Sequence, residues 1–110
     1  MTPDQLRKTA LALPDTTEAP HFNYSSFRVR GKIFATVPPA AEDRVHVFAG
    51  EEERQRALAL HPDIVEILTW GKKVVGLRIV LSKAPVALMQ HLLRDAWRAK
   101  APKSLTGDGS

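Results

Sequence analysis

The sequence predicts an α+β protein in which an antiparallel sheet packs against helices as a two-layer sandwich. The expected elements follow one another in the order helix, strands, helix, strand, helix. Two of the strands are separated by a turn that is too short to join parallel neighbours, so the sheet must contain antiparallel pairs. A doubly wound parallel fold, which alternates single strands with helices, does not fit this order.

Length and composition are those of one globular domain. The chain has 110 residues, of which 44% are hydrophobic and 25% charged, and it contains no cysteine. A chain of this length can bury a hydrophobic core without stabilising cross-links, and the missing cysteines exclude disulfides and thiolate catalysis. No segment is apolar enough for a membrane span, and residues 1–8 do not have the pattern of a secretory signal. We therefore expect a cytoplasmic protein with one domain over residues 1–103 and a disordered tail over 104–110.

Three segments have the periodicity and end signals of helices. The first follows Thr2, which we expect to cap it in a capping box, and ends before Pro14. The second begins with three consecutive glutamates, which suit the positive end of the helix dipole, and Pro62 stops or bends it. The third begins at Pro85. Its expected buried residues are Met89, Leu92, Leu93, Ala96 and Trp97.

The strands are expected at 26–30 and 33–37, which form a hairpin about Gly31, and at 44–48 and 73–81. Residues 63–68, DIVEIL, fit a short helix by their spacing and a strand by their β-branched content, and both remain open. Residues 14–20 and 38–44 predict a loop and a turn.

The hairpin is the segment whose two faces differ most clearly. Its turn is either Arg30-Gly31 or Gly31-Lys32, and the second suits a turn with glycine at the first central position. Both registers give the same facing, with Arg28 on the outer face and Arg30 and Lys32 at the tip. The residues expected on the core face are Phe27, Val29, Phe34 and Thr36; those expected outside are Arg28, Ile33 and Ala35.

A search for reaction chemistry finds no motif. The chain has neither a Walker A loop nor a G-x-G-x-x-G pattern, and its four histidines are not at metal-ligand spacing. The glutamates 51–53 are explained by their position at a helix start. We expect no cofactor and no metal, and an enzymatic activity is not favoured.

Positive charge is the remaining signal. The net charge is +4, and residues 70–103 hold eight cations against one acid, a net of +7 that leaves −3 for the rest. Cations on or beside strands, with Tyr24, Phe22 and Trp70 available for stacking on bases, predict weak and salt-sensitive DNA binding. The candidate nucleic-acid-binding residues are Arg28, Arg30, Lys32, Lys72, Lys73 and Arg78.

An alternative is an adaptor that binds a protein or a small ligand. It would require an apolar groove, for which Trp70, Leu77 and Trp97 are the expected lining residues. A continuous surface formed by the six cations would favour DNA, and an apolar groove would favour the adaptor.

The blocks Pro20-His21-Phe22, Ser26-Phe27-Arg28-Val29 and Gly31-Lys32-Ile33-Phe34-Ala35, with LLRDAWRAKAPK near the end, resemble the MmcQ/YjbR-like family of small bacterial proteins. The resemblance extends over nearly the whole chain. It implies a compact α+β domain with a double-wing arrangement that is commonly labelled DNA-binding, and it implies no catalytic residues. The sequence departs from the family pattern at Val75-Gly76, where many members have Gly-Trp, and has its tryptophan earlier, at Trp70.

Overall fold

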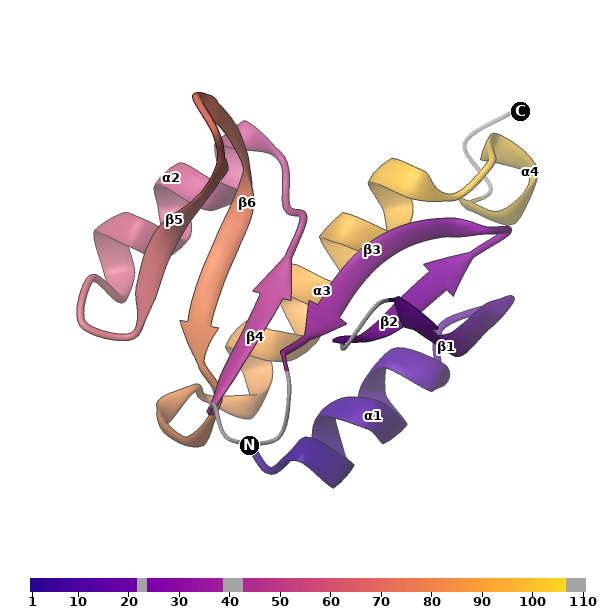
Figure 1. The fold of residues 1–110 in the computed structure, drawn as a ribbon, viewed down its shortest axis with the longest axis horizontal. Coiled ribbons are helices and arrows are strands. Elements are labelled where there is room, and N and C mark those ends of the chain that lie inside the picture. Colours follow the sequence, from indigo (N-terminus) through magenta and orange to yellow (C-terminus); the bar gives the residue numbers. More distant parts are fainter. Residues whose placement is uncertain (22–23, 39–42, 107–110) are drawn as a thin grey trace.

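The computed structural model describes residues 1–21, 24–38 and 43–106 of the chain, and it confirms the α+β class (Figure 1). A six-stranded sheet is combined with three main helices, and the described helices do not include one long and apolar enough to cross a membrane. The elements are α1 (Pro3–Leu11), β1 (Thr16–His21), β2 (Tyr24–Val29), β3 (Lys32–Val37), β4 (Arg44–Val47), α2 (Glu51–Leu60), β5 (Val65–Trp70), β6 (Lys73–Val80), the short 3-10 helix η1 (Leu81–Lys83), α3 (Val86–Lys100) and α4 (Lys103–Thr106).

The strands lie in the order β1-β2-β3-β4-β6-β5, and every neighbouring pair is antiparallel. Because β3 and β6 both run antiparallel to β4, they begin at the same end of the sheet. The β2–β3 and β5–β6 turns therefore lie at one end, and Figure 1 shows them diverging, one at the right and one at the upper left. The order also leaves β1 and β5 as the edge strands.

One hydrophobic core joins the sheet to all three main helices. It includes Leu6 of α1, Ala57 of α2 and Leu92 of α3, together with strand residues such as Phe27 and Leu77. Burial in a single cluster means that the three helices pack on the same side of the sheet. The predicted stripe of α3 is confirmed, because Met89, Leu92, Leu93, Ala96 and Trp97 are all buried.

The helix ends confirm the expected capping. The Thr2 hydroxyl accepts a hydrogen bond from the Gln5 backbone N–H, and the Gln5 side chain accepts one from the Thr2 N–H, which completes the capping box. Helix α2 begins with its three glutamates and ends at Leu60, so Pro62 follows the helix rather than bending it. Helix α1 ends at Leu11, three residues before Pro14.

Two local predictions change in the structure. The expected loop over 14–20 is wrong, because residues 16–21 form the strand β1 at the edge of the sheet. Pro20 has no N–H to donate, and an edge strand tolerates this because one of its sides has no neighbouring strand. The open choice for DIVEIL is resolved as a strand, since residues 65–70 pair with β6 along their whole length. The predicted turn over 38–44 lies largely outside the described residues.

The predicted facing of the hairpin is correct except at two residues, Ala35 and Thr36. Phe27 lies opposite Ala35 but Arg28 lies opposite Ile33, so β3 carries an extra residue, Phe34, at a β-bulge. The bulge turns Ala35 to the core and Thr36 to the outer face, the reverse of the prediction for these two residues.

The turn itself is Arg30-Gly31, with φ of +50° and +82°, rather than the favoured Gly31-Lys32. Positive φ at both central residues is the type I′ geometry, whose twist matches that of the flanking strands. At the other end of the chain, residues 103–106 form the short helix α4, which includes the first residues of the tail expected over 104–110.

Candidate functional site

The sheet has one face that none of the three main helices covers, and we call it the helix-free face. Side chains alternate along each strand, so the residues between the core positions point to this face. Among the described residues its charged side chains include Arg28, Arg44, Lys73 and Arg78, with Glu66 as the acid between them. This face therefore has a positive balance.

A row of polar residues crosses the helix-free face from strand to strand. The register places Ser26 opposite Thr36, Thr36 opposite His46, His46 opposite Arg78, and Arg78 opposite Glu66. Ser26, Thr36 and His46 are 0%, 4% and 5% exposed. No buried side-chain nitrogen or oxygen in the described part of the chain lacks a hydrogen-bond partner, so the buried members of the row are satisfied.

The row holds two arginines in fixed positions. The Ser26 hydroxyl donates to the Ala19 carbonyl at 2.7 Å and accepts from Arg28 Nε at 3.0 Å. Arg78 Nε donates to His46 Nε2 at 3.4 Å, and its Nη1 lies 3.4 Å from Glu66 Oε1. These contacts use some of the five N–H donors of each guanidinium and leave others for a ligand.

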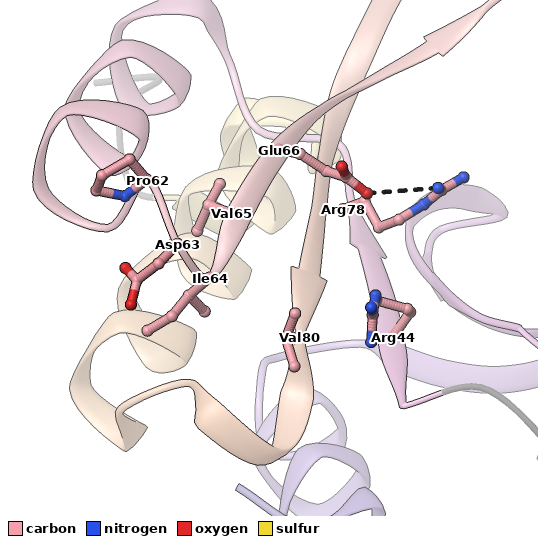
Figure 2. A pocket seen from close by; sticks show the side chains of 8 residues that line it. All are labelled: Arg44, Pro62, Asp63, Ile64, Val65, Glu66, Arg78 and Val80. Carbon is pink, nitrogen blue, oxygen red and sulfur yellow. Dashed lines mark hydrogen bonds and ion pairs between the residues drawn. The ribbon is translucent and has the colours of Figure 1, made fainter.

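A hollow of about 190 Å³ lies at one end of this face, where β5 begins (Figure 2). Arg44 and Arg78 come from neighbouring strands and lie at one side of it, while Asp63 lies at the other. Val80 and Ile64 lie between them. The Glu66–Arg78 ion pair, drawn as a dashed line in Figure 2, borders the same hollow.

An aromatic pair lies at the opposite end of β5. The Trp70 ring meets the Phe48 ring edge-on, with centroids 5.3 Å apart, and Trp70 is 57% exposed. Gly76 permits this contact: a Cβ there would lie 2.3 Å from the Val47 carbonyl oxygen and 2.9 Å from Phe48 Cα. Leu68 is buried but does not belong to the main core, because it points to this face.

The cations at the two hairpin turns differ in whether a carboxylate lies close to them. Arg30 Nε lies 2.7 Å from Asp15 Oδ2, so the charge of Arg30 is paired. Lys32, Lys72 and Lys73 are exposed, and within the described residues no carboxylate pairs with them.

The six predicted cations therefore divide into three groups. Arg28 and Arg78 lie on the helix-free face, and Lys72 and Lys73 lie at the β5–β6 turn, which continues that face beside Trp70. Arg30 and Lys32 lie at the other turn. Sequence reasoning omitted Arg44, although its alternation with the core residue Val45 indicated the outer face. The candidate stacking residue Phe22 lies outside the described residues.

The three residues expected to line an apolar groove, Trp70, Leu77 and Trp97, do not lie together on one surface. Leu77 is fully buried in the core and Trp97 is 5% exposed, with its Nε1 donating to the Pro14 carbonyl at 2.9 Å. Trp70 lies on the other face of the sheet. A separate groove of about 440 Å³ runs between α1 and α3, with Lys8 and Arg94 at its sides.

Titratable groups outside the helix-free face have structural explanations. The Ser25 hydroxyl and Arg7 together lower the pKa of Glu18 from its ordinary value of 4.5, and Glu18 in turn raises the pKa of Arg7. His91 pairs with Glu53 at 2.6 Å between α3 and α2. In the described ranges no three histidine, cysteine or acidic residues are grouped as a metal site would require.

The fold is that of a small α+β protein in which the main helices cover one face of an antiparallel sheet. The chain belongs to the YjbR family, whose model matches residues 11–99. The structure is similar to the crystal structure of the Deinococcus radiodurans protein DR2400, described by the domain DUF419, with a TM-score of 0.75 and 22% identity over 99% of this chain and 95% of that one. At this identity the similarity shows the fold alone. A comparison with curated proteins gives no match.

Proposed function

We propose that the protein binds nucleic acid along the helix-free face and the adjoining β5–β6 turn, without catalysis. One observation carries the proposal: Arg28, Arg44, Arg78 and Lys73 share the only side of the sheet that is clear of the main helices, as far as the described residues go. Guanidinium and ammonium groups on one surface attract a phosphate backbone and release its counterions, which favours binding.

The supporting arginines are already ordered. Ser26 holds Arg28, and His46 and Glu66 hold Arg78. Ordering a long side chain costs conformational entropy on binding, and a group that is positioned beforehand avoids part of that cost. The position of both hairpin turns at one end of the sheet also supports the double-wing geometry that the family resemblance implies.

The β5–β6 turn provides the test. We expect Lys72→Ala/Lys73→Ala to weaken binding to a 20-nucleotide DNA and to lower the dependence of log Kd on log salt by about 1.4 to 1.8, because two phosphate contacts are lost. Fluorescence anisotropy of a labelled oligonucleotide, titrated at several salt concentrations, measures both quantities.

The matched control is Lys8→Ala/Lys83→Ala, which removes the same charge from α1 and η1. If binding were only a response to net charge, both double variants would lose affinity equally, and the proposed surface would be wrong. The absence of binding by the wild type at low salt and high protein concentration would exclude the function altogether.

A small anionic ligand in the hollow beside Arg44 and Arg78 is the second candidate. The volume of about 190 Å³ suits a group of few atoms, and two guanidiniums at one side suit a phosphate or carboxylate. Thermal unfolding with and without millimolar inorganic phosphate tests it: stabilisation that Arg44→Ala abolishes would support this candidate, and no stabilisation would exclude phosphate.

A further inference from the structure

We infer that the nucleic acid is bound as a single strand, with one unpaired base stacked on Trp70. This inference rests on the proposed function and specifies its ligand. The base would occupy the exposed side of an aromatic residue that the fold positions and the core does not use.

Trp70 has the exposure and the support that a stacking residue needs. It is 57% exposed, whereas the other tryptophan, Trp97, is 5% exposed and hydrogen-bonded in the core. The Phe48 ring lies at 77° to the Trp70 ring and supports it from one side. Phe48 can come this close only because Gly76 has no side chain. The platform is therefore built by backbone contact between β4 and β6.

Cations lie beside this platform where phosphates would be. Lys73 is directly opposite Trp70 in the β5–β6 ladder, and Lys72 is in the adjoining turn. Further along the same ladder, the buried Leu68 is opposite Gly76, which has no side chain. Arg78 and Glu66 follow, and Glu66 is four residues from Trp70, or about 13 Å along an extended strand. A strand with one base on Trp70 can therefore run toward Arg78 and the hollow beside Arg44.

A duplex does not offer the same contact. Its bases are stacked on both faces inside the helix, so none is available to an aromatic ring without being extruded at a cost in energy. Stacking of an unpaired base on an aromatic side chain is sequence-tolerant because every base has a π face. We accordingly expect a preference for single strands without a marked base preference.

Intrinsic fluorescence tests the inference because the chain has only two tryptophans. Single-stranded DNA is expected to quench the emission of Trp70, while the duplex of the same sequence binds more weakly and quenches little. A strand with abasic positions, which keeps the phosphates and lacks the bases, is expected to bind like the duplex or less well. In Trp70→Phe the remaining emission comes from Trp97 and should not respond to DNA.

The variants separate stacking from charge. Trp70→Ala is expected to lower single-strand affinity roughly 5- to 150-fold, the effect of losing one stacked base, and Trp70→Phe to restore part of it. Lys72→Ala/Lys73→Ala should change the salt dependence, whereas Trp70→Ala should leave it unchanged. Circular dichroism and thermal unfolding of Trp70→Ala verify that the fold is kept, as its exposure predicts.

The outcomes distinguish this inference from the proposed function. Salt-sensitive binding with equal affinity for single strand, duplex and abasic strand, and no quenching, would overturn stacking on Trp70 and leave charge-driven binding in place. No binding to any of the three would overturn the proposed function itself.

Discussion

The hairpins β2–β3 and β5–β6 have their turns at the same end of the sheet, and each turn has a glycine with positive φ, Gly31 in one and Gly71 in the other. The β5–β6 hairpin also has Gly76 within a strand, where the reason for glycine is different. Gly31 has open space around it and a φ of +82°, so its turn needs a residue that accepts left-handed geometry. Gly76 lies within its strand and has no space for a Cβ, because the backbone of Val47 and Phe48 lies against it.

The cations at the two hairpin turns also differ, in whether a carboxylate pairs with them. Asp15 pairs with Arg30 at the first turn, whereas Lys72 and Lys73 at the second have no carboxylate partner among the described residues. Within the described residues, the first hairpin has one cation paired next to β1 and Lys32 without a carboxylate partner, whereas both turn lysines of the second lie unpaired beside the exposed Trp70.

The largest expected effect is that of Gly76→Ala. The new Cβ would lie 2.3 Å from a backbone oxygen and 2.9 Å from a Cα, and neither atom can move aside as a flexible side chain could. We expect a loss of about 2–3 kcal/mol in the free energy of unfolding, measured by urea denaturation. The emission of Trp70 should also change as Phe48 is displaced.

Gly50→Ala is the control, because nothing lies within 4 Å of a Cβ at that position. Its cost, that of a weaker helix cap, should stay at about 1 kcal/mol or less. Equal stability of Gly76→Ala and the wild type would show that β4 and β6 separate without cost, and the account of the Phe48–Trp70 contact would then be wrong.

The variant Arg30→Asn compares two contributions to stability at the β2–β3 turn: the cost of left-handed backbone geometry and the gain from an ion pair. A side chain such as that of arginine in left-handed geometry costs about 1–2 kcal/mol, and asparagine tolerates it better. The Arg30–Asp15 pair is exposed, at 56% and 47% of the two side chains, and such pairs contribute about 0.2–1 kcal/mol. We expect the relief of the backbone cost to exceed the loss of the ion pair. The variant should therefore be more stable than the wild type by about 0.5 kcal/mol in the free energy of unfolding, measured by urea denaturation.

Asp15→Asn isolates the ion pair, because Asp15 also has a positive φ that asparagine accepts. It should lose a few tenths of a kcal/mol at low salt and nothing at about 1 M salt, where surface pairs are screened. A loss of stability in Arg30→Asn would mean that the pair with Asp15 contributes more than the turn geometry costs.

A pH-dependent effect is expected for Glu18→Gln, at the junction of β1 with β2 and α1. Ser25 and Arg7 hydrogen-bond the carboxylate and lower its pKa from 4.5, so the folded state favours the ionised form. This contribution is present at neutral pH and is lost as the pH falls below about 4.5 toward the lowered pKa. The variant should be less stable than the wild type at pH 7, by up to about 1 kcal/mol, and this difference should decrease as the pH is lowered from 4.5 to 3.

Glu52→Gln is the matched control, since the Glu52 side chain is 87% exposed. Urea denaturation at both pH values should find it within about 0.5 kcal/mol of the wild type. A difference for Glu18→Gln that is no smaller at pH 3 than at pH 7 would show that its effect comes from packing rather than from charge.

Much of the fold could be predicted because it depends on local patterns. Thr2 and Gln5 cap α1 through contacts three residues apart, and the stripe of α3 repeats with the period of a helix. The strand β1 could not be predicted in this way, because Pro20 argues against a strand unless the strand is known to lie at an edge. The bulge at Phe34 likewise has no signal in the alternation of its neighbours.

The candidate site divides along the same line. Alternation placed Arg28 and Arg78 on the outer side of their strands, and the same rule applied to β4 would have added Arg44. The pairing of Arg30 with Asp15 joins residues 15 apart, and the approach of Phe48 to Trp70 depends on strands that are not neighbours along the chain.

The sequence by itself determined the fold class, the helices and the inward or outward direction of most strand residues, because each of these depends on neighbours within a few positions. The tertiary structure decided the strand order, the grouping of cations from β2, β4 and β6 on one face, and the choice of which cations pair with acids. Those properties depend on which strands lie side by side, and that arrangement is selected by packing the whole core at once.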